Sequence, residues 1–352
     1  MVGVPQQLRP KRSVQDSDPR LEVPLPPFKT VLGRVPGGSA AGHAGAKDAH
    51  PALIRQRRVG NAFASLHAAR RASDCLDNLR LHPDRGLGMM TDPNAYYCGG
   101  LGVELYDLFT GGGLLTGDVE FYLDSARRFG GPILELGTGT GRVLMPLADA
   151  GHKVVGMDIS RPMLDRAAAK LRERPELTSR VRLVEGDMTS FDLEQRFALA
   201  LVPARSFQHV VTPEGQRLAL NCIRRHLMPG GHLILDLFDP NFELLFGNDS
   251  KAPPREAQHP RSGHLIRRTV VARSTDPFQQ TVHEVLRFEE FDGAGNVVGS
   301  EETSWSLRWN LRQETAYLLE LTGFEVIDLY SDFGGSPPDY GREQLWVARA
   351  RQ

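Results

Sequence analysis

Short apolar segments alternate with amphipathic segments between residues 132 and 240. The apolar segments, such as 132–137 and 152–158, have the length of buried strands, and helical spacing of apolar residues follows each one. Ser160 followed by Pro162 is typical of the first turn of a helix. The alternation predicts a doubly wound, mostly parallel α/β sheet with a ligand crevice at the carboxyl ends of its strands.

The pattern changes after Pro240. Three longer β-rich segments follow, separated by turn signals such as Asp292-Gly293: residues 264–274, 279–293 and 296–310. They predict an antiparallel β insert within residues 241–310, placed after the fifth strand. We expect this insert to cover the ligand crevice or to contact a second subunit. Trp305 and Trp309 are spaced by four, which puts them on one face if a strand continues through both.

Residues 1–88 show neither helical nor strand periodicity and are rich in Pro, Gly, Ala and Arg. This composition predicts a disordered basic extension ahead of a domain spanning residues 89–352. Met89 opens the part with globular composition, so a natural start of translation at that point stays open as an alternative.

Composition and charge narrow the class of protein. The chain has 352 residues and 40% hydrophobic content, enough for a sizeable core. Its formal net charge of -1 favours neither nucleic acid nor a membrane as partner, whereas a homodimer remains possible. Three cysteines without a C-x-x-C pair, and no apparent secretory signal, favour a cytoplasmic protein. The scattered histidines predict no metal site.

A glycine-rich turn follows the first predicted strand. Gly137, Gly139 and Gly141 have G-x-G-x-G spacing, and the absence of Cβ atoms allows a ligand to approach the backbone. The dinucleotide fingerprint would have its third glycine at position 142, which is Arg142 here. The spacing therefore disfavours NAD and FAD, and the lack of a Gly-Lys-Ser/Thr sequence excludes a P-loop.

Acidic residues mark three successive strands: Glu135, Asp158 and Asp187. Asp158 follows the glycine turn by about twenty residues, where a carboxylate can accept hydrogen bonds from ribose hydroxyls. Asp187 would be within reach of an adenine amino group. This acidic pattern indicates an adenosine ligand with a cationic end and no phosphates, because phosphate sites collect positive charge.

The segments "LELGTGTGR", "VVGMDIS..ML" and "VEGDM" resemble consecutive motifs of the Rossmann-like, class I S-adenosylmethionine-dependent methyltransferases. The tail "RWNLRQETAYLLELTGFEVIDLYSDFGG" is similar to the end of small-molecule members related to those acting on amino sugars and other metabolites. The resemblance covers residues 96–350. It implies a seven-stranded sheet and direct in-line transfer of the methyl group of S-adenosylmethionine to a nitrogen or oxygen of a small metabolite.

The resemblance also implies donor-binding residues. They lie in an N-terminal aromatic segment, the glycine turn, the next two strand ends and the start of the loop after the fourth strand: Tyr97, Tyr106, Glu135, Gly137, Thr138, Gly139, Gly141, Arg142, Asp158, Ile159, Met163, Gly186, Asp187, Met188 and Pro203. In this set Glu135 faces the amino group of the donor and Asp158 holds its ribose, while Ile159 and Met163 pack on the adenine.

The loop after the fourth strand reads Val202-Pro203-Ala204-Arg205, where DNA and glutamine amide methyltransferases have an Asp/Asn-Pro-Pro-Tyr/Phe motif. The difference argues against a nucleobase or an amide nitrogen as acceptor. His209, Arg205 and Tyr106 become the candidate catalytic residues, with His209 as the base for an oxygen acceptor, since its ordinary pKa is near neutrality. An amine acceptor would need no dedicated base.

Two alternatives remain at this point. One is a peptide or protein methyltransferase that uses the basic N-terminal extension to bind an acidic partner. The other is a non-catalytic S-adenosylmethionine-binding module.

Overall fold

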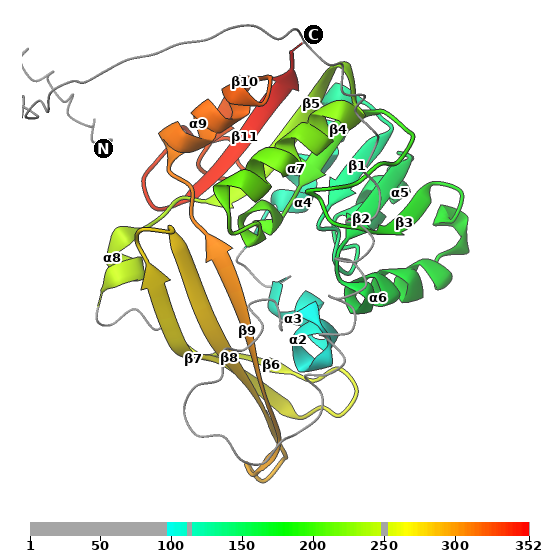
Figure 1. Cartoon of the computed structure of the whole chain (residues 1–352). Coiled ribbons are helices and arrows are strands. Elements are labelled where there is room, and N and C mark those ends of the chain that lie inside the picture. The colour runs from blue at the N-terminus through cyan, green and yellow to red at the C-terminus, as the bar shows by residue number, and fades with distance from the viewer. Residues whose placement is uncertain (1–96, 111–114, 248–252, 352) are drawn as a thin grey trace, which may run out of the picture. The chain divides into compact units, whose positions relative to one another are not determined.

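The computed structural model of the protein describes residues 97–110, 115–247 and 253–351 (Figure 1). A seven-stranded sheet has the order β10-β11-β5-β4-β1-β2-β3. Its strands are β1 (Ile133–Leu136), β2 (Val154–Asp158), β3 (Val181–Glu185), β4 (Phe197–Val202), β5 (Leu227–Phe238), β10 (Phe324–Tyr330) and β11 (Glu343–Ala350). Strands β1 to β5 pair in parallel, and β11 runs antiparallel to both β5 and β10.

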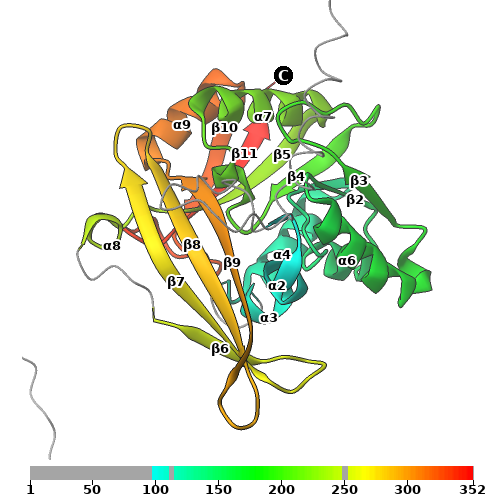
Figure 2. The same cartoon turned by 60° about the horizontal axis from the view of Figure 1, so that its bottom comes forward.

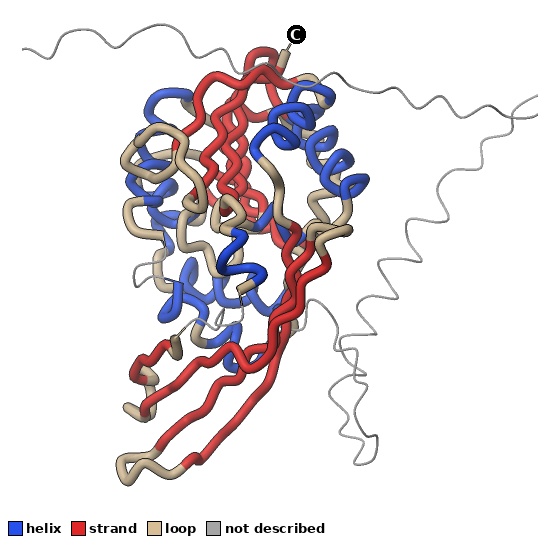
Figure 3. The backbone as a smooth tube through the Cα atoms, turned by 90° about the vertical axis from the view of Figure 1, so that its left-hand side faces the viewer, coloured by secondary structure: helices blue, strands red, loops and turns tan. Residues whose placement is uncertain are grey.

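Helices cover both faces of this sheet, as Figure 3 shows. They are α4 (Asp118–Phe129), α5 (Leu144–Asp149), α6 (Arg161–Arg172), α7 (Pro213–His226) and α9 (Arg312–Leu321). The strand period of two divides β1 between two cores, since Leu134 packs with Phe207 and Ile223 whereas Ile133 packs with Tyr122 and Leu144. Burial of β1 on both faces explains why its residues other than Glu135 are all apolar.

The second sheet is antiparallel and consists of β6 (Arg255–Gln258), β7 (Leu265–Asp276), β8 (Thr281–Phe291) and β9 (Val297–Arg308). It follows β5 in the chain, after the short helix α8 (Phe242–Phe246). Figures 1 and 2 show β9 beside two short N-terminal helices, α2 (Gly100–Glu104) and α3 (Tyr106–Thr110). The Leu101 amide donates to a carboxylate oxygen of Glu301 in β9 at 2.9 Å.

A third apolar cluster joins three separate parts of the chain. Its buried members come from α2 and α3, from α6 and from one face of the antiparallel sheet: Val103, Leu105, Phe109, Met163, Ile266, Val270, Leu286 and Phe288. Tyr97, Tyr106 and Trp305 pack against it. The antiparallel sheet is therefore anchored on the helix that follows β2, next to the carboxyl ends of the parallel strands.

The predicted doubly wound sheet and the antiparallel insert are both confirmed. The prediction that Trp305 and Trp309 share a strand face is wrong, because β9 ends at Arg308. Trp305 packs with the third cluster, whereas the ring of Trp309 lies 5.9 Å from that of Phe246.

The expectations for residues 1–88 and for the start of the domain at residue 89 lie outside the described residues. Among the described residues, the helices are all too short or too polar to span a lipid bilayer.

Candidate active site

The glycine turn after β1 is packed between β2 and the loop after β4. Gly137, Gly139 and Gly141 have φ values of 70°, 54° and 78°, a region that residues with a Cβ rarely adopt. A Cβ on Gly137 would lie 2.4 Å from the Cβ of Ser206, so glycine is required there for space as well as for conformation. The Thr138 amide donates to the Met157 carbonyl at 3.0 Å, which fixes the turn against β2.

Glu135 lies beneath this turn and is only 2% exposed. Its Oε1 accepts a 3.0 Å hydrogen bond from the Thr138 hydroxyl, while its buried Oε2 has no hydrogen-bond partner among the described residues. Burial raises the pKa of Glu135 to about 8. A buried carboxylate oxygen without a partner is suited to a cationic group, which would restore the lost solvation.

Asp158 ends β2 and accepts two backbone hydrogen bonds, from Gly139 N at 2.7 Å and from Ser160 N at 2.8 Å. Burial raises its pKa. The next residue, Ile159, is 58% exposed, which is unusual for a large apolar side chain at a strand end. Met163 is buried in the third cluster close by in α6. A carboxylate next to an open apolar surface suits a ribose bearing a flat aromatic base.

Asp187 and Met188 follow β3. Asp187 Oδ1 accepts from the amide and the hydroxyl of Thr189, at 2.8 and 2.7 Å, which shapes the turn after the strand. Met188 packs against the core that contains Leu134. The Gly186 amide donates to the Asp158 carbonyl at 2.9 Å, so the ends of β2 and β3 are held together.

Arg142 and Tyr106 lie on two sides of the turn. Arg142 pairs with Asp118 at the start of α4, with Nη1 2.9 Å from Oδ1, and thereby ties the turn to α4. Tyr106 comes near the turn from α3, since a Cβ on Gly139 would lie 3.9 Å from its Cε1.

The loop Pro203–Ser206 after β4 has two consecutive non-glycine residues with positive φ, Ala204 at 54° and Arg205 at 63°. The Arg205 guanidinium pairs with Glu343 at the start of β11. It points to this carboxylate and lies over the ring of Phe238, 5.5 Å from its centroid.

His209 lies in the single turn of 3-10 helix Ser206–His209 and contacts two distant segments. Its Nε2 is 2.7 Å from the Tyr97 hydroxyl and its Nδ1 is 3.1 Å from the Ser306 carbonyl in β9. A carbonyl can only accept, so Nδ1 carries the proton and Nε2 accepts from Tyr97. Burial lowers the pKa of His209 to about 4, so the ring is neutral at pH 7.

The structure brings most of the candidate residues to the carboxyl ends of the parallel strands. His209 and Tyr97 are in contact, and the ring of Trp305 lies 6.3 Å from that of His209. Sequence reasoning missed Asp236 and Glu343. Asp236 lies near the carboxyl end of β5 and is therefore, like Glu135 and Asp158, an acidic residue at the crevice side of a parallel strand. The argument that singled out Glu135 and Asp158 in the sequence would also have found it.

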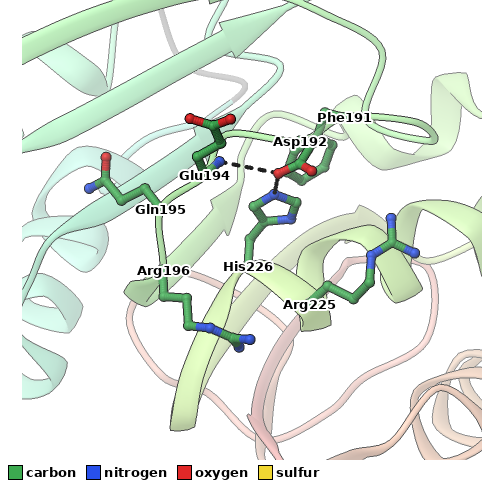
Figure 4. Close-up of a pocket in the computed structure, with 7 residues that line it drawn as sticks. All are labelled: Phe191, Asp192, Glu194, Gln195, Arg196, Arg225 and His226. Carbon is green, nitrogen blue, oxygen red and sulfur yellow. Dashed lines mark hydrogen bonds and ion pairs between the residues drawn. The ribbon is translucent and has the colours of Figure 1, made fainter.

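A cavity of about 420 Å³ lies elsewhere, lined by Phe191, Asp192, Glu194, Gln195, Arg196, Arg225 and His226 (Figure 4). Arg196 and His226 directly precede β4 and β5, so this cavity is at the amino ends of the parallel strands, opposite the glycine turn. His226 Nε2 lies 3.1 Å from the Leu193 amide and 3.5 Å from Asp192 Oδ1. The ring is thus held by the loop before β4.

Comparisons with known proteins agree with this geometry. Residues 133–231 match the family model of a methyltransferase domain. The cypemycin N-terminal methyltransferase of a Streptomyces species is 28% identical over 269 residues, which make up 75% of this chain and 100% of that protein. The structure of the CcbJ methyltransferase from Streptomyces caelestis has a TM-score of 0.59 and 25% identity, covering 74% of this chain and 100% of that chain.

The chain is a class I S-adenosylmethionine-dependent methyltransferase. The same fold occurs in CalS10, an amino pentose methyltransferase from Micromonospora echinaspora whose structure has S-adenosylmethionine bound. That structure has a TM-score of 0.53 and 21% identity, covering 70% of this chain and 96% of that chain. S-adenosylmethionine is the methyl donor, and it supplies a methyl group on an activated sulfonium.

The described residues of the methyltransferase fit this donor. The donor carries an amino group, a ribose and an adenine, and the crevice offers a buried unpartnered carboxylate oxygen on Glu135, a second carboxylate on Asp158 and the exposed Ile159. These groups follow one another from β1 to β2, which is the order that an extended nucleoside would need.

Proposed function

We propose that this methyltransferase transfers the methyl group to an amine nitrogen of a small metabolite by direct in-line displacement. The observation that carries the proposal is the state of His209. Both of its ring nitrogens are engaged, and its pKa of about 4 makes it a poor proton acceptor at neutral pH. An alcohol needs a base as it attacks, whereas a neutral amine already presents a lone pair.

The donor contacts are part of this proposal. Glu135 binds the amino group of the donor, the backbone of Gly137 and Gly139 lies along its methionyl part, and Asp158 accepts from its ribose hydroxyls. Ile159 and Met163 pack on the adenine, and Asp187 and Met188 lie at its edge. With a sulfonium as the leaving group, the remaining work of the protein is to align the acceptor and to exclude water.

The antiparallel sheet forms the acceptor side of the site in this proposal. Trp305 and Ser306 of β9 lie against His209, and the Arg268 guanidinium of β7 stands 5.4 Å from the Trp305 ring. Tyr97 completes this wall from the N-terminal segment. Glu284 accepts a 2.9 Å hydrogen bond from Trp305 Nε1, so the wall is aromatic with charged groups of both signs beside it. Such a wall suits a compact metabolite with both apolar and polar groups.

A second candidate acceptor is the α-amine at the N-terminus of a peptide. The name of the Streptomyces relative favours it, since this chain covers the full length of that N-terminal methyltransferase. Both candidates share an amine as the nucleophile, and they differ in the size of the molecule that carries this amine.

Matched acceptor pairs test the proposal. The full chain is incubated at pH 8 with S-adenosylmethionine and either glucosamine or glucose, and either an alanine-first tripeptide or its N-acetyl form. Release of S-adenosylhomocysteine and the mass of the methylated product are measured. We expect methylation only of partners that carry a free amine. Methylation of glucose, or of the acetylated peptide on a hydroxyl, without methylation of an amine would contradict the proposal.

A further inference from the structure

We infer that Asp236 and Glu343 are positioning residues: they hold the loop Pro203–Ser206 in a strained conformation against the donor-binding turn. The inference rests on the donor site in the crevice and does not depend on which acceptor is methylated. Neither residue belongs to the loop, and each acts through a different loop residue.

The loop is unfavourable by itself. Ala204 and Arg205 both adopt the left-handed region, with φ values of 54° and 63°. Residues with a Cβ rarely occupy this region, and two in succession persist only where surrounding contacts impose them. Such strain is characteristic of functional loops, and it directs attention to the groups that impose it.

Asp236 supplies the first anchor. Its Oδ2 accepts a 2.9 Å hydrogen bond from the Ala204 amide, and the Tyr122 hydroxyl lies 3.5 Å from the same oxygen. The residue is 0% exposed, and within the described part of the chain its Oδ1 has no hydrogen-bond partner. Burial and the nearby Glu343 raise the pKa of Asp236 to about 7. A buried carboxylate of this kind costs stability, which directs attention to the contact that it makes with the loop.

Glu343 supplies the second anchor by pairing with the Arg205 guanidinium, which also lies over the Phe238 ring. Gln208, two residues after the loop, adds a third contact, because its Oε1 accepts from the Phe238 amide at 2.9 Å. The loop is thus fixed to β5 and β11 at Ala204 and Arg205, and the helical turn that follows it is fixed to β5.

The anchored loop sets the shape of the donor turn. The Ser206 hydroxyl donates to the Pro203 carbonyl at 2.7 Å, and its Cβ would be 2.4 Å from a Cβ on Gly137. A shift of the loop would therefore open or close the turn that lies along the methionyl part of the donor. In-line transfer is sensitive to displacements of about 1 Å, which cost roughly 100-fold in rate.

Relief of the strain tests the inference. Calorimetric titration of the full chain with S-adenosylhomocysteine is the primary measurement, since it needs no acceptor. We expect Asp236→Leu to weaken this affinity at least tenfold, on the order of one lost hydrogen bond to a charged group. Asp236→Asn, whose amide oxygen can still accept from Ala204, should stay within about threefold.

The decisive variant is Ala204→Gly in the Asp236→Leu background. Glycine adopts the left-handed region freely, so it should recover most of the lost affinity. Glu194→Gly is the matched control, because Glu194 also has a positive φ, 51°, but lies before β4 at the other edge of the sheet. It should recover nothing. Wild-type affinity in Asp236→Leu, or equal recovery by both glycine variants, would overturn the inference.

A double-mutant cycle of Glu343 and Arg205 tests the inference if Asp236→Leu does not fold. Glu343→Gln should weaken affinity in the wild-type background and have no further effect in Arg205→Gly, which removes the guanidinium and the strain at position 205. Additive effects would overturn the inference. Absence of amine methylation by the wild-type protein would count against the proposed acceptor and leave these titrations unaffected. With an amine acceptor in hand, kcat should follow the same order as the affinities.

Discussion

The Tyr97 hydroxyl donates a 2.7 Å hydrogen bond to Nε2 of His209, a residue 112 positions later in the chain. On the other side of the ring, Nδ1 donates to the Ser306 carbonyl at 3.1 Å. One imidazole therefore joins the N-terminal segment, the loop after β4 and the antiparallel sheet. It holds together the three parts that surround the proposed acceptor position.

Tyr97→Phe should lower the melting temperature by several degrees. It leaves Nε2 of a buried ring without a partner, which costs roughly 1–3 kcal/mol, and a protein of this size loses about 2–4 °C per kcal/mol. Differential scanning fluorimetry measures the change. Tyr317→Phe, at a tyrosine that is 65% exposed on α9, is the control and should leave the melting temperature unchanged.

The pH dependence of stability should show a neutral His209. Because burial lowers its pKa from 6.5 to about 4, the folded protein binds fewer protons than the unfolded chain between these values. Stability should fall as the pH is lowered through this window, and His209→Gln should remove that part of the fall. A kinetic inflection near pH 6.5 that disappears in His209→Gln would show instead that the ring acts as a base.

Glu135 should make donor binding stronger as the pH rises. Its pKa is raised from 4.5 to about 8, so the folded protein holds a proton here that the unfolded chain has lost, and this group costs stability as the pH rises through that window. A cationic amino group binds the ionised form. Affinity for S-adenosylhomocysteine should therefore increase from pH 6 to pH 8, with release of a proton.

Glu135→Gln should flatten this pH dependence and weaken binding at pH 8 by roughly 10- to 100-fold, the equivalent of one hydrogen bond to a charged group. Titration calorimetry in two buffers of different ionisation enthalpy measures the released proton. Equal proton release by the variant and the wild type would assign the titration to another residue.

Gly137→Ala and Gly151→Ala should separate steric conflict from backbone strain. Both glycines have positive φ, 70° and 95°, so alanine at either position should cost roughly 1–2 kcal/mol of stability. At Gly137 the new Cβ would also lie 2.4 Å from Ser206, whereas at Gly151 it meets no described atom within 4 Å.

Only Gly137→Ala should then lose affinity for S-adenosylhomocysteine, by tenfold or more. Calorimetry and a melting curve on each variant give the two quantities. Similar affinities in the two variants would mean that the turn yields to the extra methyl group.

The sheet, the glycine turn and the identity of the methyl donor were predictable because their signals are local. The glycine spacing and Asp158 lie within residues 133–160, and the alternation of strands and helices can be followed segment by segment over residues 132–240. None of these signals needs tertiary information. The mostly parallel seven-stranded sheet and the antiparallel insert followed from these signals and from the family resemblance, and the structure confirms both. The order of the seven strands was not predicted.

Features that depend on distant pairing were not predictable in this way. Glu343 reaches Arg205 only because β11 runs antiparallel to β5, with Glu343 opposite Phe238. The two hydrogen bonds of the His209 ring are made with Tyr97 and Ser306, which lie 112 and 97 positions away in the chain. The end of β9 was missed because Arg308 turns inward there to pair with Glu314, a contact that the alternation of side chains does not encode.

The antiparallel sheet is one uninterrupted stretch of chain, Arg255–Arg308, that leaves after β5 and returns before α9. It rests on α2, α3 and Met163 through an apolar face whose buried residues are Ile266, Val270, Leu286 and Phe288. A chimaera that grafts the corresponding hairpins of a related protein would therefore need to keep this apolar face, together with the contacts of Glu301 with Leu101 and of Ser306 with His209. The proposed donor site, built from β1 and β2, would pass unchanged into an enzyme with a different antiparallel sheet.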